Sequence, residues 1–238
     1  MEDIRINKYI ALCGICSRRE ADTLIEAGRI LINGEKAQLG SRVSEGDKVL
    51  MDGKEIKPEE KKVVAYYKPV GITCTEADVH ASVTLKEVFH YDTRLTYAGR
   101  LDEESEGLLL MTNDGDLIHT MMCGSNNHEK EYLVTVDKAI DPMIIERMGK
   151  GIFLFDLNVE TKPCKAEKVD DTTFKIILTQ GLNRQIRRMC FECGLDVVKL
   201  KRIRVCNILL GDLKPNEYRE ITGSELEELY RMVFRSNE

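Results

Sequence analysis

Residues 99–115 read GRLDEESEGLLLMTNDG and place an acidic turn directly before an apolar run. Residues 108–111 are typical of a short buried strand, and residues 112–115 of the turn that ends it. We therefore expect Asp102 at the mouth of a packed sheet rather than on a solvated face. A carboxylate held there can act as a nucleophile, general acid or base, metal ligand or ion-pair partner. For a lone aspartate the simpler role is to close the turn.

Length and composition describe an ordinary globular chain. The 238 residues suffice for one large domain, or for a small domain joined to a medium one. No basic start with an apolar run is visible, and no apolar stretch approaches the roughly 18 residues of a membrane span. We therefore expect a cytoplasmic protein that does not bind membranes. The net charge of −6 argues against indiscriminate nucleic-acid binding, although a local basic face remains possible.

Eight cysteines without a secretory context are expected to be reduced thiols. Two pairs, Cys13 with Cys16 and Cys190 with Cys193, have the spacing of metal ligands. A four-cysteine zinc site would have to join opposite ends of the chain. Residues three apart also share a helix face, and cysteine is commonly a small buried hydrophobe. We therefore assign no metal, and no role to the four scattered histidines.

Residues 1–58 are predicted to form a compact unit of two helices followed by strands. Ser17 and Glu20 have the spacing of a capping box that begins the second helix. Asn33-Gly34 is a strong signal for a two-residue hairpin. Several basic residues fall in or beside the helices, where they could contact phosphates or simply solvate the surface: Arg5, Lys8, Arg18, Arg19 and Arg29.

Residues 59–62 belong to a polar, aperiodic stretch and are predicted to be a linker between this unit and a second domain, residues 63–238. The second domain begins with a β-branched and aromatic strand that Lys68-Pro69 ends, since proline cannot donate to a ladder. In the later strand over residues 130–136, alternation places Tyr132 on one face with valines. A half-buried strand tyrosine is the simplest interpretation of that position.

The overall charge conceals a basic segment. From Gly181 to Arg204 there are seven basic residues against two acidic ones. A helix is predicted to open within residues 183–189 and to end at Gly194. Its apolar face consists of Ile186, Met189, Cys190 and Cys193, while Arg184, Arg187 and Arg188 share the opposite face.

These motifs together resemble one enzyme family. Residues 99–115 resemble the catalytic motif of RNA pseudouridine synthases of the RsuA-like branch, whose members modify ribosomal RNA. Residues 17–21 and 28–34 resemble the S4 RNA-binding domain. Lys68-Pro69 resembles the motif that supports the active-site loop in this family, and residues 181–189 resemble its third motif. The resemblance implies an α+β fold: a small S4 domain followed by a catalytic domain on a mixed, largely antiparallel sheet.

The resemblance also implies the chemistry. Uridine is isomerised when its N1–C1′ bond breaks, the uracil turns, and the base rejoins the sugar through C5. Asp102 would attack the nucleotide or abstract a ribose proton, Arg187 would pair with Asp102 and keep it ionised, and Tyr132 would stack on the uracil. No cofactor is implied. Basic side chains in both domains would bind the RNA: Arg5, Lys8, Arg18, Arg19, Arg29, Arg100, Arg184 and Arg188.

Details within residues 128–132 and 180–189 most resemble the F-type members, which modify RNA of the large ribosomal subunit. We therefore expect 23S ribosomal RNA as the substrate rather than 16S, with the protein acting as a monomer. The other acids of the turn, Glu103, Glu104 and Glu106, are expected to solvate it. The alternative is a non-catalytic RNA-binding or ribosome-assembly factor with the same fold. A nucleoside hydrolase, which would need a second carboxylate, is a weaker alternative.

Overall fold

The computed structural model describes residues 3–75, 83–123 and 127–235. The chain divides into two compact units, which we describe separately. The first unit contains residues 1–62 with 91–96 and 112–115; the second contains residues 63–90, 97–111 and 116–238. Within the described ranges, the longest helix has 13 residues, and none combines the length and apolar character needed to span a bilayer.

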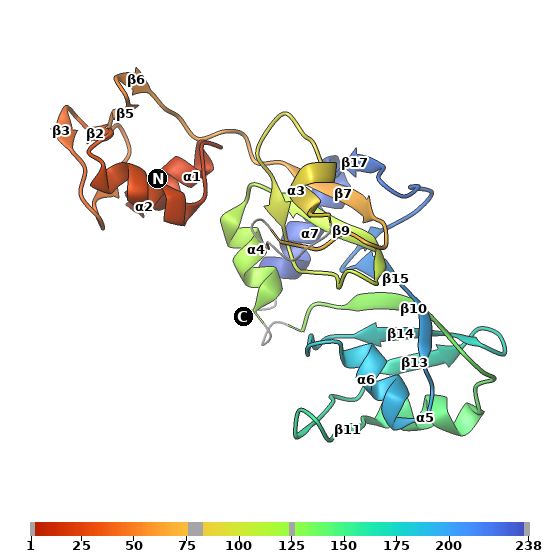
Figure 1. Ribbon diagram of the computed structural model, residues 1–238. Coiled ribbons are helices and arrows are strands. Elements are labelled where there is room, and N and C mark those ends of the chain that lie inside the picture. The colour runs from red at the N-terminus through yellow and green to blue at the C-terminus, as the bar shows by residue number, and fades with distance from the viewer. Residues whose placement is uncertain (1–2, 76–82, 124–126, 236–238) are drawn as a thin grey trace. The chain divides into compact units, whose positions relative to one another are not determined.

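The first unit consists of two short helices and small sheets (Figure 1). The predicted capping box of α2 is confirmed: the Glu20 N–H donates to the Ser17 hydroxyl at 3.3 Å, and the Ser17 N–H donates to the Glu20 carboxylate at 2.8 Å. The predicted hairpin is confirmed where Asn33 and Gly34 both have positive φ between β2 and β3. Bounds are α1 Ile6–Leu12, α2 Arg18–Glu26, β1 Ile4–Arg5, β2 Ile30–Ile32, β3 Glu35–Lys36, β4 Arg42–Val43, β5 Val49–Met51 and β6 Lys54–Glu55.

Residues 59–62 carry no helix or strand but are bonded to the turn at residues 112–114. The Thr112 hydroxyl donates to the Lys62 carbonyl at 2.6 Å, and the Asn113 amide donates to the Glu60 carbonyl at 2.9 Å. The Lys61 ammonium lies 2.8 Å from the buried carboxylate of Asp114. Side chains that follow the apolar strand therefore hold this segment.

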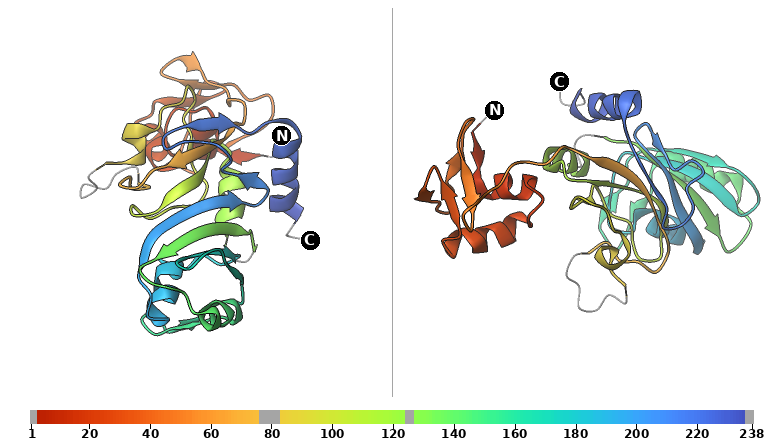
Figure 2. Two further views of the ribbon diagram at one scale, coloured as in Figure 1. Left: turned by 90° about the vertical axis from the view of Figure 1, so that its right-hand side faces the viewer. Right: turned by 90° about the horizontal axis from the view of Figure 1, so that it is seen from above.

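A nine-stranded sheet forms the second unit, in the order β13-β14-β10-β15-β9-β7-β17, with β16 paired to β15 and β8 to β9. The predicted mixed, largely antiparallel sheet is confirmed, because β15 and β9 are parallel while the pairs β10–β14, β10–β15, β13–β14 and β7–β17 are antiparallel. Figure 2 shows β10 and β15 as long neighbouring strands. Bounds are β7 Val63–Lys68, β8 Thr96–Tyr97, β9 Glu106–Thr112, β10 Lys130–Val136, β13 Lys165–Lys168, β14 Thr173–Leu178, β15 Val197–Val205, β16 Ile208–Leu209 and β17 Tyr218–Glu220.

The helices of this unit cover two separate hydrophobic cores. One core joins β7 and β9 to α4 and α7, and the other joins β10 and β14 to α5 and α6 (Figures 1 and 2). As predicted, Ile186, Met189 and Cys190 of α6 are buried in the second core. Bounds are α3 Leu85–Val88, α4 Gly115–Met122, α5 Pro142–Lys150, α6 Gln185–Glu192 and α7 Gly223–Arg235.

Three strands of the second unit have no counterpart in the sequence-based prediction. The hairpin of β11 (Phe153–Leu154) and β12 (Val159–Glu160) has two residues in each strand, too few for a period to be visible. The third, β13, reads Lys-Ala-Glu-Lys and lies at the edge of the sheet, where it needs no apolar alternation. Pairing with a neighbouring strand, rather than local pattern, determines these elements.

Gly107 allows β9 to approach β15 closely. Its φ is 108°, and a Cβ atom added there would lie 2.2 Å from the Arg202 carbonyl oxygen. No real Cβ fits at that distance, and other residues rarely adopt this φ. The glycine after the acidic turn is therefore required by contact with a strand almost a hundred residues later.

We predict that Gly107→Ala lowers the free energy of unfolding by at least about 2 kcal/mol, because the two strands must separate. Urea denaturation of the full chain measures this. The matched control is Gly181→Ala, since Gly181 has ordinary φ and a methyl group added to it would meet nothing within 4 Å; its stability should change by less than about 0.5 kcal/mol. Equal stability of the two variants would contradict the close approach.

Candidate active site

Asp102 begins the turn that leads into β9. The turn is closed by the Ser105 N–H, which donates to the Asp102 carbonyl at 3.0 Å. The Asp102 side chain is partly exposed. Across residues 3–75, 83–123 and 127–235, its carboxylate has no hydrogen bond and no ion pair, so both oxygens can contact a ligand.

Lys68 supports this turn from inside the protein. Its side chain is fully buried, and its ammonium donates to the carbonyls of Ser105 and Pro69, both at 2.8 Å, and lies 3.5 Å from the Glu103 carbonyl. Lys68 therefore supports the turn that carries Asp102, the structural role that the resemblance of Lys68-Pro69 implied. Burial lowers the pKa of Lys68, while negative groups that include Asp102 act in the opposite direction.

Arg202 is a second buried cation at this turn, and the sequence analysis missed it. Its side chain is only 2% exposed. The guanidinium donates to the Leu108 carbonyl at 2.7 Å through Nε and to the Arg100 carbonyl at 3.3 Å through Nη1. It therefore binds the chain on both sides of Asp102. The available signal was an arginine in step with buried Leu200, two residues earlier in the same strand.

Tyr132 lies on β10, in the same sheet as β9, the strand that follows the Asp102 turn. It faces Ile176 of β14 on one side and Arg202 of β15 on the other, and Arg202 in turn faces Gly107 of β9. Two strand spacings, roughly 10 Å, therefore separate the backbones of Tyr132 and Gly107. The tyrosine is half-buried against the core of β10 and β14, which agrees with the simplest interpretation of its position.

Arg187 contacts the Asp102 turn, but through a different acid from the one expected. Its Nε lies 3.5 Å from the Glu104 carboxylate, and its Nη2 donates to the Glu104 carbonyl at 3.2 Å. Arg184 lies 2.7 Å from the same carboxylate and lowers the pKa of Glu104 by a hydrogen bond. Among the described residues the expected Arg187–Asp102 pair is not formed. Adjacent acids in one turn point in different directions, which spacing alone does not resolve.

Glu106 is buried rather than solvated. The Tyr67 hydroxyl donates to it at 2.9 Å, and the Lys199 ammonium lies 3.1 Å from its other oxygen. Burial and this hydrogen bond raise the pKa of Tyr67 to about 12. The expectation that Glu104 and Glu106 only solvate the turn is therefore wrong, since both carboxylates are paired with cations.

A cavity of about 660 Å³ lies beside the turn. Both arginines that bind Glu104 line it, as does Lys199, but Asp102 and Tyr132 are not among its lining residues. The structure thus gathers Arg184 and Arg187 at the side of the turn that carries Glu104. It places Tyr132 on the sheet, and Asp102 forms no ion pair with either arginine.

The other predicted RNA-binding residues differ in the exposure of their side chains and in the partners that the structure gives them. Arg100 is exposed, whereas Arg188 is held by an ion pair with Asp156 and donates to the Asn183 carbonyl at 2.8 Å. Arg29 in the first unit is exposed but bound to Asp52 through two hydrogen bonds. The remaining four lie on or beside α1 and α2 with exposed or partly exposed side chains: Arg5, Lys8, Arg18 and Arg19.

The cysteine pairs are parts of hydrophobic cores. Cys13 and Cys16 pack in the core of the first unit. Cys190 and Cys193 pack in the core that α5 and α6 cover in the second unit. Burial raises the pKa of both Cys13 and Cys190 to about 12, which keeps these thiols protonated. In the part of the chain that the structure describes, no three His, Cys, Asp or Glu side chains cluster as metal ligands would.

We predict that Lys68→Met lowers the free energy of unfolding by about 1–3 kcal/mol, because buried carbonyls around the turn lose their donor while the side-chain volume is kept. Thermal or urea denaturation measures the loss. Lys150→Met is the control, since Lys150 is 75% exposed and its ion pair with Glu146 is a surface pair. A Lys68→Met chain as stable as this control would show that the ammonium does not support the turn.

Comparison with known proteins places this geometry in a family. Residues 62–192 match the family model described as RNA pseudouridylate synthase, and residues 4–59 match the S4 domain. The chain is 43% identical over 237 residues to the dual-specificity RNA pseudouridine synthase RluF of Escherichia coli O6:H1, covering 98% of this chain and 81% of that protein.

Other pseudouridine synthases are similar to this chain over most of its length. The ribosomal small subunit pseudouridine synthase A of Vibrio parahaemolyticus is 32% identical over 234 residues, covering 95% of this chain and all of that protein. A crystal structure of a pseudouridylate synthase, 31% identical, matches with a TM-score of 0.70 and covers 95% of this chain and 99% of that one. The chain therefore belongs to the RsuA-like family of RNA pseudouridine synthases, which carry an S4 domain before the catalytic domain, and it is an isomerase.

Proposed function

We propose that the chain converts a specific uridine of ribosomal RNA, in 23S rather than 16S, to pseudouridine, with Asp102 as the essential carboxylate. The N1–C1′ bond breaks and a C5–C1′ bond forms. The proton lost from C5 is balanced by protonation of N1, so no water is consumed. The target base has to leave its stack before Asp102 can reach its sugar or its ring.

The observation that carries this proposal is the state of the acids in the turn. Glu104 and Glu106 are each paired with cations, whereas the Asp102 carboxylate is unpaired within the described residues. A hydrolase would need a second free carboxyl group as acid or base. The Thr73 hydroxyl donates to the exposed Glu103 at 3.4 Å, so Asp102 is the one acid of this described turn whose carboxylate has no side-chain partner, which favours an isomerisation that proceeds without added water.

Arg187 and Tyr132 complete the proposed site. The Arg187 guanidinium donates a hydrogen bond to the Glu104 carbonyl, so it positions the segment that carries Asp102. We propose that Arg187 exchanges the Glu104 carboxylate for that of Asp102 when RNA binds. Tyr132 would stack on the flipped uracil, since stacking on an aromatic ring offsets part of the cost of removing a base from a helix.

The remaining basic residues would hold the RNA by its phosphates. We propose that residues 1–58 act as the S4 domain, that residues 59–62 connect it to the catalytic domain of residues 63–238, and that the chain acts as a monomer. Arg5, Lys8, Arg18, Arg19 and Arg29 would serve the first domain and Arg100, Arg184 and Arg188 the second. Such contacts orient RNA without reading its sequence.

The preference for 23S rests on the F-type resemblance of residues 128–132 and 180–189, which the 43% identity to RluF supports. That relative is named as having dual specificity, and another is named for the small ribosomal subunit. Pseudouridine mapping should therefore cover both ribosomal RNAs and the remaining cellular RNA. A site present only in cells that contain this chain, and located in 23S, is the expected result.

We predict that Asp102→Asn abolishes pseudouridine formation and changes RNA affinity by less than about twofold, because one neutralised carboxylate leaves the phosphate contacts intact. Mapping in cells that lack the gene and carry the variant, together with filter binding, measures both. Asp212→Asn, at an exposed acid, serves as the control and should retain full activity. Modification by Asp102→Asn at the wild-type rate would refute the essential role of this residue.

We predict that Glu104→Gln tightens RNA binding and steepens its dependence on salt by about one phosphate contact, because Arg184 is released from its carboxylate partner. Arg184 lowers the pKa of Glu104, so the carboxylate of the wild-type chain stays charged even below its ordinary range. The difference from wild type should therefore persist from about pH 5 to 9. Glu227→Gln, at an exposed position of α7, is the control. Identical salt slopes for all three proteins would contradict the prediction.

A further inference from the structure

Two phenylalanines project into solvent next to the proposed site. Phe155 lies in the turn between β11 and β12 and is 74% exposed, and Phe191 lies on α6 and is 72% exposed. Leaving large apolar rings in water forfeits the free energy that their burial would supply. Exposed aromatic rings that lie near each other often mark a binding surface.

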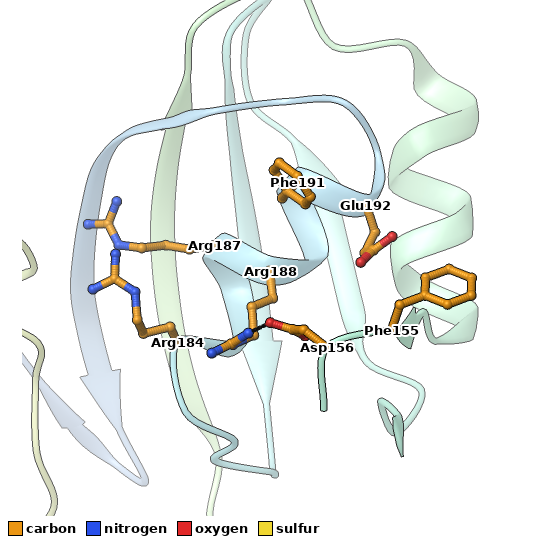
Figure 3. Close-up of a pocket in the computed structure, with 7 residues that line it drawn as sticks. All are labelled: Phe155, Asp156, Arg184, Arg187, Arg188, Phe191 and Glu192. Carbon is orange, nitrogen blue, oxygen red and sulfur yellow. Dashed lines mark ion pairs between the residues drawn. The ribbon is translucent and has the colours of Figure 1, made fainter. Parts of the chain in front are cut away.

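The hairpin that carries Phe155 is attached to α6. Asp156 forms an ion pair with Arg188 of the helix (Figure 3). The turn is closed by the Asn158 N–H, which donates to the Phe155 carbonyl at 3.4 Å, and Phe153 meets the Phe155 ring edge-on with centroids 5.1 Å apart. Phe155 is therefore held in an outward position before any ligand arrives.

Between the hairpin and the helix lies a cavity of about 420 Å³, which Phe155, Phe191 and three arginines help to line (Figure 3). Two of these arginines, Arg184 and Arg187, also line the cavity beside the Asp102 turn. An RNA strand that crosses the Asp102 turn can therefore continue along α6 onto the two rings without leaving the protein surface.

The chemistry of this surface fits unpaired nucleotides. Aromatic rings stack on nucleobases regardless of sequence, and guanidinium groups bind phosphates and stack on bases as well. Two acids line the cavity, Asp156 and Glu192, and Asp156 is already paired with Arg188. A stable protein interface buries about 1,200 Å² or more, which two rings around a small cavity do not provide.

We infer that Phe155 and Phe191 form a nucleobase-stacking surface that holds unpaired nucleotides flanking the target uridine. The inference rests on the proposed function, because it takes the RNA to pass over the Asp102 turn. The rings contribute to binding and placement of the RNA, and the bond-making steps remain with the residues of the proposed site.

A fluorescence experiment tests the stacking directly. The chain contains no tryptophan, so Phe155→Trp and Phe191→Trp each introduce a single tryptophan whose emission can be excited selectively. The probes are a 23S ribosomal RNA transcript and an oligoadenylate of about 12 nucleotides. Both variants should be quenched on titration with RNA, while Met143→Trp on α5, where Met143 is 75% exposed, should not. No quenching by either probe at concentrations that saturate binding would overturn the inference.

Kinetics provide the second test. The double variant Phe155→Leu with Phe191→Leu keeps apolar side chains but removes the ring faces. We expect KM for the 23S transcript to rise at least about fivefold with kcat unchanged, since each stacked base contributes that much or more. The corresponding double tyrosine variant should restore KM. An unchanged KM in the leucine variant, or a fall in kcat alone, would overturn the inference.

The proposed substrate and the stacking surface can be tested separately. If wild-type protein forms no pseudouridine in the 23S transcript, the proposed substrate is wrong, yet quenching by oligoadenylate still reports on the rings. If the transcript is modified while both tryptophans remain unquenched, only the stacking surface is wrong. Asp102→Asn combined with Phe191→Trp allows the quenching to be measured without turnover.

Discussion

Two buried cations bind the backbone of the Asp102 turn, and the geometry of the site depends on them. A charge moved out of water is costly unless its donors are bonded. Here carbonyl oxygens accept from the Lys68 ammonium and from Nε and Nη1 of Arg202, while Arg202 Nη2 is buried without a hydrogen bond among the described residues. Lys68 binds the turn after Asp102, while Arg202 binds the chain at Arg100 and Leu108. Because these contacts are made to backbone carbonyls, they hold the turn without using its side chains.

The acids of the turn have separate roles as a consequence. Glu106 points inward to Tyr67 and Lys199, and Glu104 points toward α6, where Arg184 and Arg187 meet it. Asp102 is left without a partner among the described residues. The arrangement also explains how a chain of net charge −6 can bind RNA: Glu104 and Glu106 are paired with basic side chains for which an RNA phosphate can compete.

Local physics determined much of the fold, and these features could be predicted from the sequence. The capping box at Ser17 and Glu20, the hairpin at Asn33-Gly34 and the apolar face of α6 each depend on residues within a few positions of one another. The same holds for the strand that ends at Lys68, and for the likeness of residues 99–115 to a catalytic motif. Such signals need no knowledge of distant contacts.

Only the tertiary structure decided which distant groups meet. Arg202 reaches Leu108 across 94 positions, and Arg187 reaches Glu104 across 83, so sheet order and the packing of α6 choose these partners. Likewise, the β11–β12 hairpin brings Phe155 to α6, although its strands are too short to show a pattern. The sequence by itself determined most of the elements and the turn that carries Asp102. Long-range packing determined which charges are neutralised there, because such pairings depend on chain segments that no local pattern links.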